Sequence, residues 1–368
     1  MSKNQPIPAI EAQTPEPVLP MSDIQGIVVP GFLKQHQTLV GVAASDKSAA
    51  VFLFKKLLRD LAGDISAAAE TLDDRRWHRE AKASPAPEAP VPKALLGIGF
   101  TFQGLQKLTP GAASLPSDAF RKGLAARSAF LGDPTDPADE GNPKNWKVGA
   151  PPHELDALFI VAGDTRAAAD ERSSALLSII AQAGLEVVYN EKGDVREDLP
   201  GHEQFGFDDG ISQPGIRGRA SGDPDDFVTP RHIAASEQPE QSLFGYPGQD
   251  LVWPGVLVLG HPASSPDPLI PGLPSPAIPE WSRNGSYLVF RRLRQDVGLF
   301  WRTMRQEAYG SFKGLPKGMP TRRMRRIYVE SRPPVSEPES RVFTLRIWAA
   351  QGHVTPAGSA LDCGKLST

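Results

Sequence analysis

The chain has 368 residues and a mass of 39.6 kDa, which is long enough for two domains of ordinary size. Its formal net charge is only -3, so no strong field would gather a polyanion and nucleic acid is not an expected partner. A single cysteine, Cys363, excludes intrachain disulfides and a CxxC metal or redox site.

The first twenty residues contain several prolines and no apolar core, which is typical of neither a secretion signal nor a membrane span. We therefore predict a flexible arm over residues 1–21. Together with the lone cysteine, the missing signal favours a cytoplasmic protein without membrane contact.

The next part of the chain predicts the element order β-α-β-β-α-β. Short apolar runs predict four strands, and helical apolar spacing follows the first and the third of them. Residues 79–93, rich in Pro, Ala and charge, predict a linker before the second strand. This order is that of the ferredoxin-like split βαβ plan, in which helices cover one face of an antiparallel sheet. The expected strands are Thr38–Ala43, Ala94–Phe100, Ala157–Asp164 and Leu185–Tyr189, with helices around Phe54–Leu61 and Leu176–Ile180.

The second half begins the same plan again and then loses its pattern. Beyond Met304 the sequence is basic and broken by prolines, and only Val342–Ala350 predicts a strand there. We therefore predict an α+β protein with a ferredoxin-like domain over residues 22–195 and an incomplete second one over 196–368. The expected elements are strands near Gln204–Phe207, Val256–Gly260 and Ser286–Phe290, and a helix with a core-facing stripe of Leu293, Val297, Phe300, Trp301 and Met304.

The densest group of reactive side chains lies between Gly201 and Gly215, where Asp208 and Asp209 stand among glycines. Glycine lets the backbone approach a flat ligand closely. From the residues alone, a solvated Asp-Gly turn is the favoured interpretation.

The string Gly206-Phe207-Asp208-Asp209-Gly210 resembles the GxxDG signature of the dye-decolorising (DyP-type) haem peroxidases. Four further segments resemble the family in the same order, and the resemblance covers residues 22–305. It implies two ferredoxin-like α+β units that face each other, as in a dimeric α/β-barrel. The further segments are Asp23–Ala43, Ile98–Leu108, Leu251–Pro262 and Asn284–Phe300.

The resemblance also implies a cofactor, two substrates and a site. The cofactor is haem b, and hydrogen peroxide oxidises a bulky phenolic or dye-like aromatic donor. Asp209 is implied as the distal residue that shuttles the peroxide proton, and an ordinary aspartate, ionised at neutral pH, can accept one. Asp208 is expected to face solvent or to cap the turn. The residues implied to contact the haem are Gly210, Ile211, Ser212 and Gln213.

The family's proximal motif resembles T-P-x-G-S-H-I-R, but this chain has Ala360 at the position of the iron-binding histidine, after Thr355-Pro-Ala-Gly-Ser359. His353 is a weak substitute ligand, and Cys363 a weaker one. The departure indicates a C-terminally truncated or frame-altered member, in which the distal-Arg segment has no counterpart. Two alternatives stay open: a haem-deficient chain without peroxidase activity, and a non-catalytic haem-binding module.

Other motifs predict no further site. The histidines lack the HExxH spacing of a zinc enzyme, and Gly97-Ile-Gly99 lacks the third glycine of a dinucleotide loop. The basic runs Arg291–Arg294 and Arg322–Arg326 carry charge suited to phosphate or haem propionates, but a solvated face is the expected interpretation. The sequence does not indicate an oligomeric state.

Overall fold

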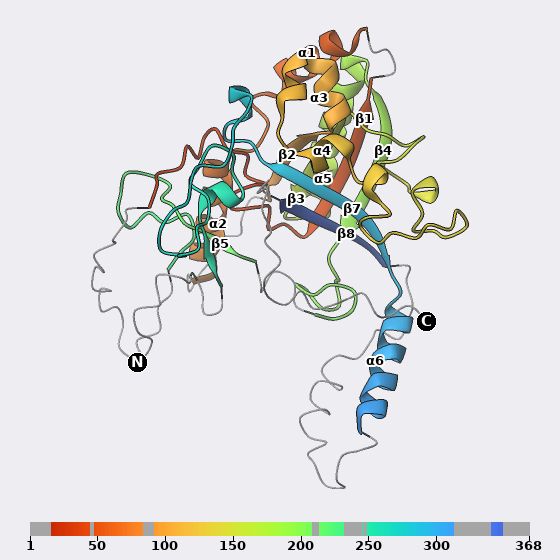
Figure 1. Ribbon diagram of the computed structural model, residues 1–368. Helices are drawn as coiled ribbons and strands as arrows, with labels where there is room; N and C mark the ends of the chain where they lie inside the picture. Colours follow the sequence, from red (N-terminus) through yellow and green to blue (C-terminus); the bar gives the residue numbers. More distant parts are fainter. Residues whose placement is uncertain are drawn as a thin grey trace, which may run out of the picture.

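The computed structural model describes residues 16–44, 48–83, 92–207, 213–231, 245, 249–312 and 340–348. A four-stranded sheet with helices on one face forms the main body, and helix α6 extends away from it (Figure 1). No helix in these ranges is both long and apolar enough to cross a bilayer. The fold is α+β.

The main sheet consists of β1 (His36–Ala43), β2 (Ala94–Phe100), β3 (Ala157–Gly163) and β4 (Glu186–Asp194). Its order is β2-β3-β1-β4 and every neighbouring pair is antiparallel. The four strands predicted from the first half are thereby confirmed, and their order is that of a ferredoxin-like unit.

The central strand β3 is buried along its whole length because both faces of the sheet are covered. Successive side chains of a strand point to opposite faces, so Phe159 and Val161 join one core cluster while Leu158 and Ile160 join another. This explains why the strand is a continuous apolar run rather than an alternating one.

Helices α1 (Ala50–Leu61) and α5 (Arg166–Ala183) pack on the face that carries Phe159. The side chain of Thr165 accepts a hydrogen bond from the Ala168 N–H at the start of α5, and Gly184 ends the helix in the left-handed conformation with φ 82°. Both helices were predicted from their apolar spacing, and both predictions are confirmed.

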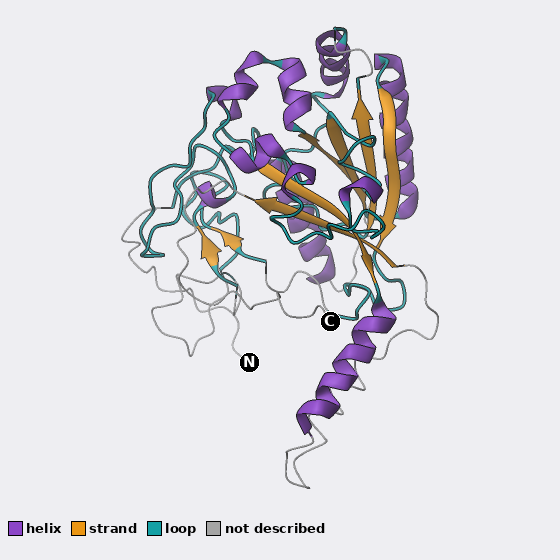
Figure 2. Cartoon of the chain, turned by 45° about the vertical axis from the view of Figure 1, so that its right-hand side comes forward, coloured by secondary structure: helices purple, strands orange, loops and turns teal. Residues whose placement is uncertain are grey.

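The opposite face of the sheet packs against β7 (Tyr287–Gln295), through Leu288 and Phe290. Strand β7 pairs antiparallel with β8 (Ser340–Trp348), and the pair runs obliquely past the sheet (Figures 1 and 2). The face that the ferredoxin-like plan leaves free is therefore covered by the second half of the chain. The strands predicted near residues 286–290 and 342–350 are confirmed.

Helix α2 (Ala68–Ala83) was not predicted, and its last residues fall in the segment expected to be a linker. The linker prediction is wrong for residues 79–83. The helix is polar and has little apolar periodicity, so its sequence pattern does not predict a helix. The buried side chains of Leu72 and Asp74 stabilise it through tertiary contacts. Two shorter helices, α3 (Phe102–Leu108) and α4 (Asp118–Lys122), follow β2.

Two predicted strands of the second half are wrong. Residues 204–207 form a turn, and residues 256–260 follow the 3-10 turn Pro254–Val256 as irregular backbone. The apolar run there is buried without being a strand, because the Val258 N–H bonds back to the Pro254 carbonyl and Gly260 has φ 83°. The described second half instead has β5 (Gly215–Ile216) parallel to β6 (Leu251–Val252).

The predicted stripe on the next helix is only partly right. Helix α6 spans Val297–Phe312, so Leu293 belongs to β7 and is exposed. Trp301 is buried as expected, but Met304 is about half exposed and does not join the core. The prediction assigned Leu293 to the helix by its spacing, although this residue still belongs to the preceding strand.

The predicted domain boundaries stay predictions. Within the expected arm, residues 16–21 lie against the second half, with Leu19 and Met21 buried in a cluster that includes Ile216 and Val258. The Leu19 N–H donates to the Arg219 carbonyl, and the Arg219 N–H donates to the Pro17 carbonyl. The described end of the arm is therefore a packed strap.

Candidate active site

Most residues predicted for the active site lie outside the described residues. These are Asp208, Asp209, Gly210, Ile211, Ser212, His353, Ala360 and Cys363. Gln213 is described: it is exposed, and its backbone carbonyl accepts a hydrogen bond of 3.1 Å from the Gln249 side chain. The structure therefore defines the segments on either side of the acidic motif.

The segment before the motif is a turn built around Glu203. One carboxylate oxygen of Glu203 accepts from the Phe205 N–H and from the Gln295 side chain, each at 2.9 Å, and the other accepts from the Phe207 N–H at 2.9 Å. The Glu203 N–H donates to the Phe207 carbonyl, and Gly206 adopts φ 99°. Three donors bind this carboxylate, so Glu203 holds the turn.

Aromatic rings brace the same turn. The rings of Phe205 and Phe300 lie 4.5 Å apart, Phe207 lies 6.0 Å from Phe300, and the Trp301 indole donates to the Phe205 carbonyl at 3.1 Å. Helix α6 thus anchors the residue that directly precedes Asp208. Phe207 itself is about half exposed, so an apolar edge faces outward beside the motif.

The segment after the motif is anchored by β5. The Gly215 N–H donates to the Asp250 carbonyl at 2.7 Å, and the Ile216 N–H donates to the Thr229 hydroxyl at 2.8 Å. A side chain at Gly215 would bring its first carbon to 2.6 Å from the Leu251 side chain, so glycine lets Leu251 pack directly against the backbone there. The acidic motif therefore lies in the chain between two segments held by hydrogen bonds, the turn of residues 203–207 and strand β5.

The structure also brings together a group of side chains that the sequence analysis did not identify. One oxygen or ring nitrogen from each of Asp74, His78 and Asp164 lies within 4.8 Å of the others. The Lys34 ammonium, only 2% exposed, lies 2.6 Å from Asp74, 2.8 Å from Asp164 and 3.4 Å from the His78 ring. Because the ammonium supplies the positive charge, the group is an ion cluster and not a metal site. The spacing of Asp74 and His78, four residues apart on one helix, was the only available signal.

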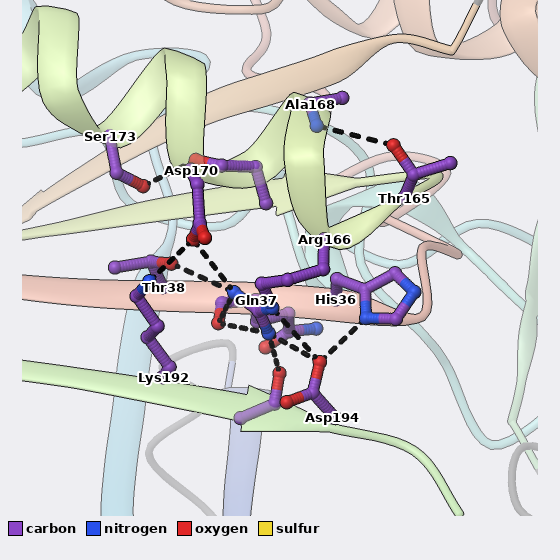
Figure 3. Close-up of polar contacts among 12 residues, drawn as sticks. His36, Gln37, Thr38, Thr165, Arg166, Ala168, Asp170, Ser173, Lys192 and Asp194 are labelled. Atoms are coloured by element: carbon purple, nitrogen blue, oxygen red, sulfur yellow. Dashed lines mark hydrogen bonds and ion pairs between the residues drawn. The ribbon is translucent and has the colours of Figure 1, made fainter. Parts of the chain in front are cut away.

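A second polar group joins the start of α5 to the edge of the sheet. The Arg166 guanidinium contacts Asp194, the Gly193 carbonyl at 2.8 Å and the Gln37 carbonyl at 3.3 Å, and His36 lies 2.6 Å from Asp194 (Figure 3). Burial opposes ionisation of Asp194, but hydrogen bonds from His36 and Arg166 outweigh it and lower its pKa. This group ties three elements together: β1, α5 and β4.

The basic run of β7 is paired with acids of the first half. Arg292 binds Glu191 through two hydrogen bonds of 2.7 and 3.0 Å, and Arg291 pairs with Asp133. Arg294 pairs with Glu140 at 2.8 Å, where both side chains are exposed. The expectation of a solvated face is wrong for Arg291 and Arg292, which are held between the halves.

The position at which the family motif places the iron ligand lies outside the described residues. Four of the five described histidines have other partners: His36 and His78 contact carboxylates, His202 contacts the Pro200 carbonyl, and His261 lies 2.7 Å from Asn284. The fifth, His153, is exposed. The exposed aromatic edge at Phe207 suits contact with a flat ring.

Comparisons with known proteins agree on one family. The profile of the DyP dimeric alpha+beta barrel domain matches residues 23–197. Peroxidase 2 of Mycetinis scorodonius is 28% identical over 213 residues, which are 58% of this chain and 34% of that protein. The dye-decolorizing peroxidase AauDyP1 of Auricularia auricula-judae is 26% identical over 296 residues, 80% of this chain and 46% of that protein.

Solved structures give the same result. An ancestral D-type dye decolorizing peroxidase has a TM-score of 0.58 and 29% identity, covering 78% of this chain and 52% of that one. A point mutant of the dye-decolorizing peroxidase from Pleurotus ostreatus has a TM-score of 0.59 and 25% identity, covering 83% and 55%. The chain thus spans about a third to a half of the length of the similar proteins.

Proposed function

Because the chain belongs to the DyP-type peroxidase family, we propose that it is a haem-dependent peroxidase that oxidises bulky phenolic or dye-like donors with hydrogen peroxide. The observation that carries the proposal is the family similarity over residues 23–197 together with the GxxDG string at 206–210. A haem cofactor is implied by the family, and haem b is the form we propose. A cytoplasmic location stays a prediction.

In this proposal Asp209 moves the proton. Peroxide cleavage needs a group that takes a proton from the attacking peroxide oxygen and returns it to the departing oxygen, which leaves as water. The turn around Glu203 and the strand β5 support this role, since they restrict the two ends of the segment that carries Asp209. Gly210, Ile211, Ser212 and Gln213 are proposed to line the cofactor.

The decisive variant is Asp209→Asn, which keeps the shape of the side chain and removes its proton acceptor. We expect peroxide-dependent dye oxidation to fall by about 10²- to 10⁴-fold while haem uptake is unchanged. The neighbouring variant Asp208→Asn is the matched control and is expected to stay within about threefold of wild type. Equal losses in both variants, or full activity in Asp209→Asn, would contradict the assignment.

The alternative is a haem-deficient chain, and Ala360 at the position of the proximal histidine favours it. A haem titration of the purified chain, followed by its Soret absorbance, separates the two. Saturable uptake with dye oxidation supports the enzyme; uptake without oxidation indicates a non-catalytic haem-binding module, and no uptake indicates the deficient chain. His353→Ala then tests whether His353 serves as the iron ligand.

The same titration can also detect a variant that binds haem more tightly than wild type. If Ala360 stands where the family places its iron ligand, Ala360→His should tighten haem binding by about tenfold or more. Leu361→His adds the same side chain one position later and should not. Equal effects from both variants would show that the motif match at Thr355–Ser359 does not locate the ligand.

A further inference from the structure

The strap at the start of the described chain carries a carboxylate into a site formed by two buried arginines. One oxygen of Glu16 lies 3.1 Å from the Arg217 guanidinium and 2.6 Å from that of Arg231. The other oxygen lies 2.5 Å from Arg231 and accepts a hydrogen bond of 2.8 Å from the Gly218 N–H. The side chains of Arg217, Arg231 and Glu16 are 5%, 12% and 11% exposed.

The two arginines are held by the second half independently of the strap. The Arg217 guanidinium lies over the Trp253 ring at 5.4 Å, and that of Arg231 lies over the Phe227 ring at 4.6 Å and donates to the Thr229 carbonyl. The Arg217 N–H is itself bonded to the Val252 carbonyl. Contacts other than those with Glu16 therefore also hold both guanidinium groups in place.

The chemistry of these donors is that of oxyanion recognition. A guanidinium presents a planar fork of N–H groups that matches a carboxylate or a phosphate, and here a backbone N–H adds a further donor. Burial lowers the pKa of both arginines, Glu16 opposes this, and the charge of Arg217 further lowers the pKa of Arg231. Among the described residues Arg231 has no acidic partner other than Glu16.

We propose that Arg217, Arg231 and the Gly218 N–H form an oxyanion-binding site whose resident ligand is the Glu16 carboxylate, and which binds a phosphate-class oxyanion when Glu16 leaves. The strap competes with the free ion at an effective concentration in the millimolar range, so wild-type protein binds phosphate weakly. Nothing in this proposal depends on haem or on peroxidase activity.

The test uses the full chain, with inorganic phosphate as the probe and sodium chloride at matched ionic strength as the reference. Glu16→Ala is expected to melt below wild type in chloride, to regain stability in phosphate with saturation, and to bind phosphate about tenfold more tightly than wild type by calorimetry. Glu154→Ala removes an exposed carboxylate of the first half and is expected to behave like wild type.

A second substitution of Glu16 and a substitution of Arg231 complete the test. Glu16→Gln keeps the size of the side chain and removes its charge, so it serves as the test variant should Glu16→Ala fail to fold, and it is expected to show the same tighter phosphate binding. The double variant with Arg231→Ala should lose the phosphate response. The proposal is overturned if phosphate acts on the Glu16 variants no more than chloride does, if the double variant responds equally, or if neither variant folds in either salt.

Discussion

At the scale of single residues, the buried Lys34 side chain lies among three ionisable side chains. Its ammonium lies between two carboxylates and a histidine ring, and one of those carboxylates, Asp164, also accepts a hydrogen bond from the Lys93 N–H at the start of β2. Three segments distant in sequence therefore meet at one charge. Removing one partner of a buried ion pair leaves the other uncompensated, which costs far more than loss of an exposed pair.

We predict that Lys34→Met lowers the free energy of unfolding by about 3 to 5 kcal/mol. Lys122→Met is the matched control because Lys122 also forms an ion pair with an aspartate, but both side chains are about 60% exposed. Its expected cost is under about 1 kcal/mol. Urea denaturation at neutral pH measures both, and similar costs in the two variants would contradict the prediction.

A second prediction at this scale concerns acid. Burial raises the pKa of Asp194, but His36 and Arg166 lower it by more, so the folded-state pKa lies below the ordinary value of 3.8. Stability from this group is therefore present above the ordinary pKa and is lost as the pH falls through the folded-state pKa. The difference in unfolding free energy between wild type and Asp194→Asn should shrink between about pH 5 and pH 2. A difference that is independent of pH would show that the charge of Asp194 is irrelevant.

At the scale of elements, short segments around the acidic motif depend on contacts from far along the chain. The turn of residues 203–207 is held by Gln295 and Trp301, which follow it by about a hundred residues. Strand β5 is formed by its parallel pairing with β6, whose Leu251 side chain packs against the backbone at Gly215. Both elements are too short to form from local propensity.

We predict that Gly215→Ala destabilises the protein by about 1 to 3 kcal/mol, because the added carbon would lie 2.6 Å from Leu251 and 2.7 Å from Thr229. Gly222→Ala, with no atom within 4 Å of the added carbon, should change stability by less than about 0.5 kcal/mol. Thermal unfolding measures both variants. A neutral Gly215→Ala would mean that β5 moves freely relative to β6.

At the scale of the whole molecule, β7 connects the two halves. Its apolar residues cover the sheet, and the Arg292 guanidinium binds Glu191 of β4 in a bidentate pair. Glu191 also accepts a hydrogen bond of 2.6 Å from the Tyr189 hydroxyl. Burial, and next the bond to Glu191, raises the pKa of Tyr189, so the phenol stays a donor at neutral pH. The Arg292–Glu191 pair is therefore a polar contact between the two halves that is largely shielded from water.

We predict that Arg292→Met costs about 2 to 4 kcal/mol, since it leaves Glu191 partly buried without its cation. Arg294→Met, on the same strand but about 62% exposed, should cost under about 1 kcal/mol. The double variant Arg292→Met with Glu191→Gln should recover part of the loss, and a strictly additive double variant would contradict a direct coupling.

The sequence by itself determined the first unit of the fold, because its strands and helices carry periodic apolar patterns that report burial directly. It also located the acidic motif and the family. It could not predict α2, whose polar surface is held by Lys34, or the irregular backbone of residues 256–260, where burial is independent of secondary structure.

Only the tertiary structure decided which charges meet. Arg292 and Glu191, Glu16 and Arg231, and Lys34 and Asp164 are separated by more than a hundred residues, and ion pairing depends on distance in space rather than on spacing in the chain. For that reason Arg291 and Arg292, which were predicted to face solvent, contact the first half of the chain. For the same reason Glu16, at the end of the predicted arm, binds Arg217 and Arg231.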